Sequence, residues 1–185
     1  MQPVAEYSSV AKWFHWITAG LLGIALIFGF LLGAVGDQLK DEAEATKYGI
    51  YTIHESAGLT LFVVAVARLL WRWRHPAPPL PETIPAALRL ASAVVHYALY
   101  AGLILQPILG FVATNAWGFP MAGATAYLGF IDLPKFMAAN VPLAEVLGKA
   151  HALLGWALAV LVVLHVGAVI FHQAIRRDGM LLRMV

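Results

Sequence analysis

The sequence has 185 residues, of which 61% are hydrophobic and only 12% are charged, and its formal net charge at pH 7 is +2. Soluble domains are usually about 25% charged and about 45–50% apolar. The composition therefore excludes a disordered chain, a coiled coil and an ordinary soluble enzyme, and it indicates a protein surrounded mostly by lipid. The chain has seven histidines and no cysteine, which excludes disulfides and any cysteine-based attachment of a metal or cofactor.

Four stretches are long and apolar enough, at about 20 residues each, to cross a bilayer as helices. In chain order they cover about 13–35, 53–73, 91–113 and 147–171. Polar or proline-rich segments at 36–52, 74–90 and 115–146 separate them and predict three loops. We therefore expect an all-α integral membrane protein, a four-helix bundle that forms one domain over residues 1–185.

An even number of spans puts both termini and the second loop on one side of the membrane. That side carries eight basic residues, Lys12, Arg68, Arg72, Arg74, Arg89, Arg176, Arg177 and Arg183, and the other side carries four, Lys40, Lys47, Lys135 and Lys149. The positive-inside rule then places both termini in the cytoplasm, and these basic residues signal topology rather than a nucleic-acid partner. A signal peptide is the competing interpretation of the first span, but its apolar run exceeds the roughly 7–15 residues of such a segment.

Four of the histidines lie at two depths in the predicted spans. His54 and His151 begin the second and fourth spans at the outer surface, whereas His15 and His165 lie toward the cytoplasm. His151 and His165 are separated by about 21 Å of helical rise and by about 40° less than four full turns, so they share one face. The sequence therefore predicts two stacked imidazole pairs, His54 with His151 and His15 with His165.

Such pairs suit haem, because haem iron takes axial ligands from opposite sides of its plane and a flat macrocycle fits between the helices of a bundle. Zinc would need three or four ligands, and neither depth offers a third one of the usual kind, although Glu55 adjoins His54. Since the chain has no cysteine, we expect two non-covalent b haems with bis-histidine ligation. Such a site moves electrons and does not bind oxygen directly.

Two glycines lie one helical turn beyond the outer histidines. Gly58 follows His54 and Gly155 follows His151, each by four residues, so they present no side chain on the face that a macrocycle would meet. We expect both to be cofactor-binding positions. Ordinary helix packing through small residues is the alternative interpretation.

Two arginines return to the His54 face near the cytoplasmic end of the second span. Arg68 and Arg72 follow His54 by fourteen and eighteen residues, where they suit anionic haem propionates or, alternatively, snorkel toward the cytoplasmic surface. Of the remaining histidines, His75 is expected in a solvated loop. His96 has two interpretations: it forms a hydrogen bond to a haem propionate or to a quinone, or it is an ordinary polar residue at the membrane interface.

His172 is the rival inner ligand, because it shares the face of His151 and His165. A pair of sites at His151 and His172 would be about 32 Å apart, a whole hydrocarbon thickness, so His165 suits the bundle better.

These segments together resemble the bacterial cytochrome b561 family, including its superoxide oxidase type. The matching segments extend over nearly the whole chain and are Lys12-Trp13-Phe14-His15-Trp16, His54-Glu55-Ser56-Ala57-Gly58, Arg68-Leu69-Leu70-Trp71-Arg72, His75-Pro76-Ala77-Pro78-Pro79, His151 with His165, and Asp178 to Met184. The His151–His165 spacing also resembles that of the haem-bearing membrane subunits of formate dehydrogenases and nickel–iron hydrogenases. The resemblance implies an inner-membrane oxidoreductase with two b haems, an outer one at His54 and His151 and an inner one at His15 and His165, and a quinone partner.

Two functions follow from this resemblance. The superoxide oxidase type passes an electron from superoxide at the periplasmic face through the haems to ubiquinone. The outward loops carry four lysines against seven acidic residues, a balance that does not favour an anionic donor. The alternative is a cytochrome b subunit that links a periplasmic dehydrogenase or electron carrier to the quinone pool, with the loop 115–146 as a lid or docking surface. A haem-free structural bundle is a third interpretation, against which the stacked histidines argue.

Overall fold

The computed structural model describes residues 5–35, 44–118 and 126–185. Four long helices dominate these residues: α1 (Ser9–Val35), α2 (Glu44–Arg74), α3 (Ala86–Ala116) and α4 (Val141–Ile170). All four are long and apolar enough to cross a membrane, which confirms the predicted all-α membrane bundle. Four of the charged residues counted above for the outer loops, Asp37, Lys40, Asp41 and Glu42, lie outside the described residues.

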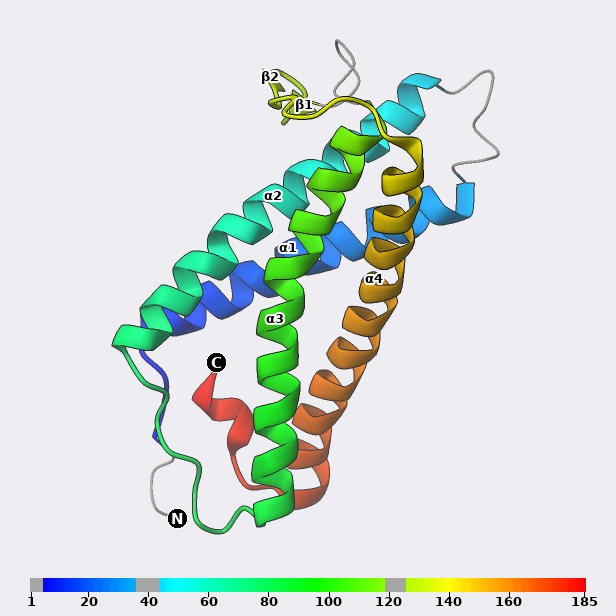
Figure 1. Ribbon diagram of the computed structural model, residues 1–185. Helices are drawn as coiled ribbons and strands as arrows, with labels where there is room; N and C mark the ends of the chain where they lie inside the picture. The colour runs from blue at the N-terminus through cyan, green and yellow to red at the C-terminus, as the bar shows by residue number, and fades with distance from the viewer. Residues whose placement is uncertain (1–4, 36–43, 119–125) are drawn as a thin grey trace.

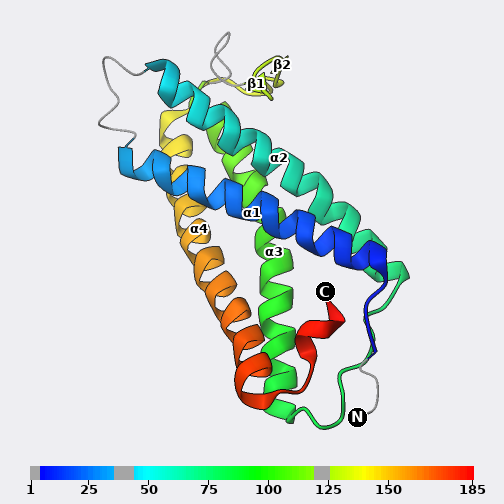
Figure 2. The ribbon, with the colours of Figure 1, turned by 180° about the vertical axis from the view of Figure 1, so that it is seen from behind.

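The helices form two hairpins that cross each other (Figures 1 and 2). α1 packs along α2, α3 packs along α4, and α2 also contacts α3. Both termini and the α2–α3 connection lie at one end of the bundle (Figure 1). A short antiparallel hairpin of β1 (Ala126–Tyr127) and β2 (Ile131–Asp132) lies at the opposite end. The shared end of the termini agrees with an even number of spans, and its cytoplasmic placement stays a prediction.

Small and branched side chains form the centre of the bundle. Leu22, Leu61, Ala65 and Leu103 make up the buried cluster between α1, α2 and α3. Large apolar side chains such as Val63 (65% exposed) face outward instead. A helix that is apolar on every side belongs in lipid, where outward apolar side chains meet acyl chains rather than water.

The helices extend beyond the apolar stretches that predict them. α2 begins at Glu44 rather than near 53, and α4 begins at Val141 rather than near 147. The side chain of Asn140 caps α4 by accepting a hydrogen bond from the Leu143 amide at 3.2 Å. Hydropathy locates the part of a helix that lies in hydrocarbon, whereas caps and local helix formers decide where the helix begins.

The chain after α4 folds back under the bundle. A π-helical turn η1 (Phe171–Arg176) follows α4, and a 3₁₀ helix η2 (Met180–Arg183) ends the chain. Arg183 is 4% exposed, and its guanidinium donates to the carbonyl oxygens of Ala5, Pro78 and Pro79. One buried arginine thus joins the C-terminus to the N-terminal segment and to the α2–α3 connection.

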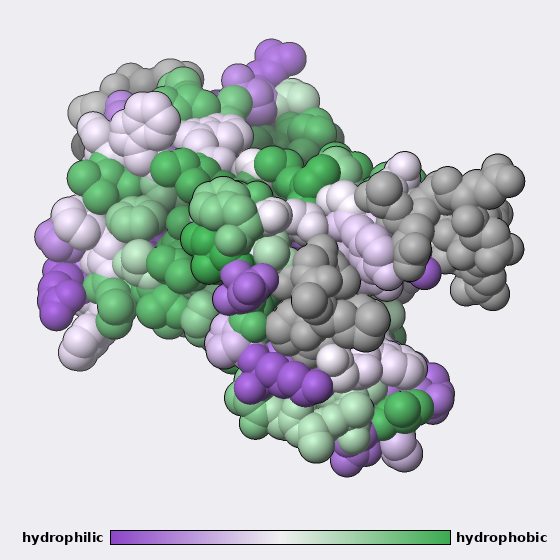
Figure 3. Space-filling model, turned by 90° about the horizontal axis from the view of Figure 1, so that it is seen from above, coloured by the Kyte–Doolittle hydropathy of each residue, from purple (hydrophilic) through white to green (hydrophobic). Residues whose placement is uncertain are grey.

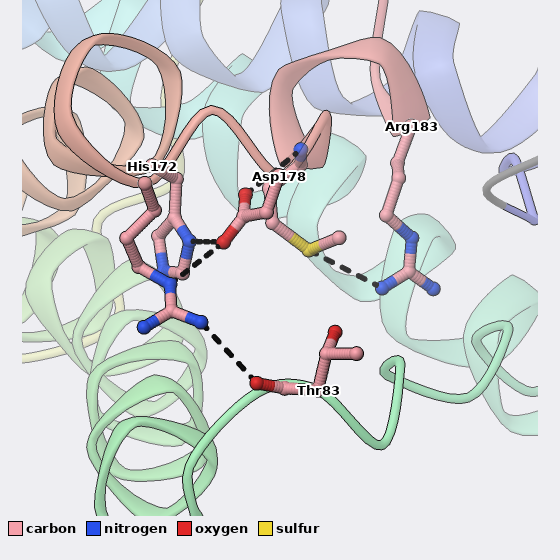
Figure 4. Close-up of polar contacts among 6 residues, drawn as sticks. Thr83, His172, Asp178 and Arg183 are labelled. Atoms are coloured by element: carbon pink, nitrogen blue, oxygen red, sulfur yellow. Dashed lines mark hydrogen bonds and ion pairs between the residues drawn. The ribbon is translucent and has the colours of Figure 1, made fainter. Parts of the chain in front are cut away.

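Asp178 organises the turn between η1 and η2 (Figure 4). Its Oδ2 accepts hydrogen bonds from His172 Nδ1 at 2.7 Å and from Arg176 Nε at 2.9 Å. Arg176 also donates to the Thr83 carbonyl at 3.2 Å. Burial by itself raises the pKa of Asp178, but the hydrogen bonds from His172 and Arg176 outweigh it and lower the pKa below its usual value.

Asp178→Asn should therefore loosen the C-terminal segment. A carboxyl group whose pKa is lowered by folding stabilises the folded state above its unfolded pKa of about 3.9, and this contribution is lost as the pH falls through the lower folded value. In the wild type we expect hydrogen-exchange protection of residues 171–185, corrected for intrinsic rates, to be full near neutral pH and to weaken below about pH 4. The variant should show weaker protection than the wild type near neutral pH, and the difference should shrink as the pH falls below about 4. Equal protection in Asp178→Asn and in the exposed control Glu82→Gln would contradict this role.

Candidate functional site

The outer histidines meet between the two hairpins. His54 on α2 and His151 on α4 have ring centroids 5.9 Å apart and ring planes at 85°. His54 Nδ1 donates to the Ala25 carbonyl on α1 at 2.8 Å, and His151 Nδ1 donates to the Gln106 carbonyl on α3 at 3.0 Å. Because a carbonyl can only accept, each Nδ1 carries the proton and each Nε2 keeps a free lone pair.

The spacing of these rings suits two ligands on one metal. With a metal–nitrogen bond of about 2.0–2.1 Å, the value for imidazole on zinc, and roughly 1 Å more to each ring centre, two opposed imidazoles have centres roughly 6 Å apart. The hydrogen bond from each Nδ1 to a carbonyl is the usual support for a ligating histidine. The outer pair thus has both the spacing and the tautomer of a bis-histidine site.

The inner histidines have the same spacing but a different hydrogen bond. The rings of His15 on α1 and His165 on α4 are 6.1 Å apart, with planes at 58°. Arg68 Nη2 lies 3.2 Å from His15 Nδ1. Because arginine can only donate, this Nδ1 accepts, and the proton lies on Nε2. Ligation through His15 Nε2 therefore requires Arg68 to leave the ring.

A third imidazole adjoins the inner pair. The His96 ring on α3 is 5.1 Å from the His165 ring, and His96 Nδ1 donates to the Ser92 carbonyl at 2.6 Å. His172, the rival inner ligand in the sequence analysis, uses its Nδ1 to bond Asp178. The structure therefore brings His96 rather than His172 to the inner site.

Arg68 and Arg72 lie beside a small cavity of about 30 Å³ at the end of the bundle that holds the termini. Trp71 also lines it, and its Nε1 is buried without a partner among the described residues. A buried N–H without an acceptor is costly, so it marks a place where an acceptor from outside the chain fits. His75 is exposed, as expected, but its ring stacks on Trp71 at 3.9 Å between centroids. The arginines and the tryptophan together suit an anionic group.

Buried polar groups also surround the outer pair. Glu55 Oε1 accepts from Thr114 Oγ1 at 3.2 Å, and Glu55 Oε2 is buried without a partner in the described chain. The Gln106 side chain donates to the His151 carbonyl at 2.9 Å, and its Oε1 is likewise unpaired in the described part. These two oxygens leave room for water or for a polar group of a bound molecule.

The glycines chosen from the sequence have unequal surroundings. A Cβ at Gly58 would meet nothing within 4 Å, and a Cβ at Gly155 would lie 3.2 Å from Gln106 Nε2. Two other glycines, Gly29 and Gly110, lie directly against the rings of His54 and His151. Sequence reasoning misses them because each contact joins two different helices, and no spacing within one helix reveals it.

The arrangement can hold two planar, metal-centred groups at two depths. α4 contributes one ring to each pair, and these rings are about 21 Å apart along the helix. Within the ranges described, no group of three or more His, Asp or Glu side chains is arranged to hold a bare metal ion. The described histidines therefore offer pairs of imidazoles rather than the three or four ligands of a zinc-type site.

Comparisons with known proteins agree with this geometry. The family model of the prokaryotic cytochrome b561 proteins matches residues 6–185. "Cytochrome b561 homolog 2" of Escherichia coli K12 is 29% identical over 181 residues, which are 97% of this chain and 91% of the relative. "Probable superoxide oxidase CybB" of Yersinia pestis is 31% identical over 135 residues, 72% of this chain and 73% of the relative. "Cytochrome b562" of Cereibacter sphaeroides is 27% identical over 179 residues, 97% and 94% of the two chains.

Thr114→Val should destabilise the outer end of the bundle. The change removes the donor to Glu55 Oε1 and leaves a part-buried carboxyl oxygen unpaired, which costs about 1–3 kcal/mol. Equilibrium unfolding in mixed detergent micelles measures this loss. Thr18→Val is the matched control, because the Thr18 hydroxyl also makes a part-buried hydrogen bond but only to the Phe14 carbonyl of its own helix, which accepts a backbone N–H as well. Equal losses in the two variants would show that the Thr114–Glu55 bond has no special role.

Proposed function

Because the chain belongs to the prokaryotic cytochrome b561 family, we propose that it carries electrons across a bacterial inner membrane through two b haems. His54 and His151 hold the outer haem, and His15 and His165 hold the inner one. The observation that carries this proposal is the pair of ring spacings, 5.9 Å and 6.1 Å, in two sites that both join a helix of the first hairpin to α4. Membrane electron transfer with b-type haem is the common property of the family.

At the outer site the protein supplies a prepared pair of ligands. The carbonyls of Ala25 and Gln106 fix the tautomers of His54 and His151 before anything binds. A hydrogen bond from Nδ1 also makes Nε2 a better donor to a metal. A haem held by His54 and His151 would supply a one-electron couple, and two histidine ligands would leave no position for oxygen on the metal.

At the inner site we infer that Arg68 changes partner. It leaves His15 Nδ1, which frees His15 to ligate through Nε2, and it binds a propionate together with Arg72 and Trp71 Nε1. Arginine binds carboxylates well because its planar donors match the two oxygens. Gly58 and Gly155 contribute by presenting no side chain to the macrocycle.

We further propose superoxide at the periplasmic end as the donor and ubiquinone as the acceptor. The excess of basic residues at the end that holds the termini supports a cytoplasmic position for that end. Two superoxide ions give up one electron each and leave as oxygen, and one ubiquinone takes two electrons and two protons to form ubiquinol. The similarity to a relative described as a probable superoxide oxidase supports this donor.

A cytochrome b subunit for a periplasmic dehydrogenase or electron carrier is the alternative. The β1–β2 hairpin supports this alternative, because its side chains Leu128, Phe130 and Ile131 are 55%, 74% and 47% exposed. Seen from above, hydrophobic residues cover much of the surface and hydrophilic residues form separate patches (Figure 3). An exposed apolar surface outside the spans suits a docked partner.

The ligand assignment predicts a selective loss. His54→Ala and His151→Ala should each lose the outer haem and keep the inner one, because each change removes one of the two side chains proposed to hold only the outer haem. A haem count per chain and a reduced-minus-oxidised absorption spectrum measure this. Glu82→Gln, a change in the exposed α2–α3 connection, should keep both haems. If the outer variants lost both haems equally, or neither, the proposed pairing would be wrong.

The donor has its own test. The purified protein with full haem content should reduce a soluble ubiquinone analogue when superoxide is supplied, without any other subunit. His54→Ala should lose this activity at least tenfold, because electrons then lack the outer haem. If the fully loaded wild type were inactive in this assay, the superoxide reaction would be excluded and the subunit alternative favoured.

A further inference from the structure

We propose that Gly29 and Gly110 are positioning residues for the outer histidines. Each glycine, with the backbone carbonyl four residues before it, fixes the ring that reaches across from the next helix of the same hairpin. The inference deepens the proposed function, on which it rests for the role of those rings as ligands.

The two contacts are nearly identical. A Cβ built at Gly29 would lie 2.7 Å from His54 Cε1, 3.1 Å from Nδ1 and 3.7 Å from Nε2. A Cβ built at Gly110 would lie 2.9, 3.1 and 3.7 Å from the same three atoms of His151. Both rings therefore press the same edge against a bare helix backbone.

The carbonyl acceptors of the two rings also occupy equivalent positions in their helices. Ala25 precedes Gly29 by four residues, and Gln106 precedes Gly110 by four residues. In an α-helix the carbonyl of residue i points toward residue i+4 and bonds its amide. A side chain at residue i+4 would occupy the space beside that carbonyl and keep the ring away from it. Glycine leaves the side open, so the ring lies against the backbone and its Nδ1 reaches the carbonyl.

This combination of a glycine and a carbonyl acceptor four residues earlier, the device that holds an outer ring, occurs once in each helical hairpin. In α1–α2 it holds His54, and in α3–α4 it holds His151, so the two rings enter the space between the hairpins from fixed positions. Their planes then lie at 85°. The inner rings lack the device, because neither His15 nor His165 is a nearest neighbour of any glycine in the described helices.

Alanine at either position should displace the ring and preserve the fold. Alanine is the better helix former by about 1 kcal/mol, so the helices themselves lose nothing. The clash falls on a side chain that can swing, and the ring must move by several tenths of an ångström to reach ordinary contact at 3.4 Å. Functional groups need to be held within about 0.5 Å. The change therefore acts on the position of the ligand.

The experiment compares Gly29→Ala and Gly110→Ala with Gly20→Ala. Gly20 is an exposed glycine of α1 with nothing within 4 Å of its Cβ position, and it lies two and a half turns before Gly29, on the opposite side of the helix. The readouts are haem content, the electron paramagnetic resonance spectrum of the oxidised protein and the midpoint potential of each haem. The spectrum depends on the angle between axial ring planes, which a general loss of stability does not alter.

We expect both variants to lose at least half of the outer haem and to shift the outer-haem signal and potential of the rest. The inner haem serves as the internal control for folding and should be unchanged. Gly20→Ala should match the wild type in all three readouts. Wild-type spectra, potentials and haem content in Gly29→Ala and Gly110→Ala would overturn the inference.

A measurement on haem-free protein separates this inference from the proposed function. With ¹⁵N-labelled histidine, Gly29→Ala should shift the ring signals of His54, and Gly110→Ala those of His151, because the hydrogen bonds from Nδ1 are lost. If these signals shift while His54→Ala keeps both haems, the positioning role stands and the ligand assignment fails. If His54→Ala loses the outer haem while neither glycine variant changes ring signals or haem, the ligand assignment stands and the positioning role fails.

Discussion

The outer site depends on one interaction, the hydrogen bond from a buried imidazole N–H to a helix carbonyl. Inside a bilayer there is no water to satisfy a polar group, so the chain must supply the partner. Ala25 and Gln106 supply it at 2.8 Å and 3.0 Å. This bond fixes the tautomer, turns Nε2 away from the helix and requires the two helices of each hairpin to lie close together. The crossing of the hairpins then brings the two rings to 5.9 Å between centroids.

At the inner site, Nδ1 of His15 accepts a hydrogen bond, whereas Nδ1 of each outer histidine donates one. Arg68 donates to His15 Nδ1, so the ring nitrogen that should bind a metal holds the proton instead. In the proposed ligation, the backbone therefore holds the outer pair ready, and a helix carbonyl cannot move away. The inner pair is held by a long side chain, which can. This difference implies that binding at the inner site includes a rearrangement of Arg68, whereas binding at the outer site does not.

Rigid local geometry explains what could be predicted from the sequence. The shared face of His151 and His165 follows from the period of a helix, and the depth of His54 and His15 follows from their places in the apolar stretches. Contacts between helices could not be predicted in this way. Gly29 against His54 and Arg68 against His15 depend on how helices pack, which no spacing along one helix contains. The first residues of α2 and α4 could not be predicted either, because local features such as the Asn140 cap of α4 determine where a helix begins and hydropathy does not.

The crossing of the hairpins also selects among the inner imidazoles. The outer pair joins α2 of the first hairpin to α4 of the second. His15 and His165 repeat this pattern from α1 and α4, at nearly the same ring spacing. His96 and His165 come from neighbouring helices of one hairpin, and their rings are closer, at 5.1 Å. If a macrocycle binds between the hairpins as proposed, His15 and His165 are the pair that would hold it, and His96 lies beside that pair with its Nδ1 bonded to the Ser92 carbonyl.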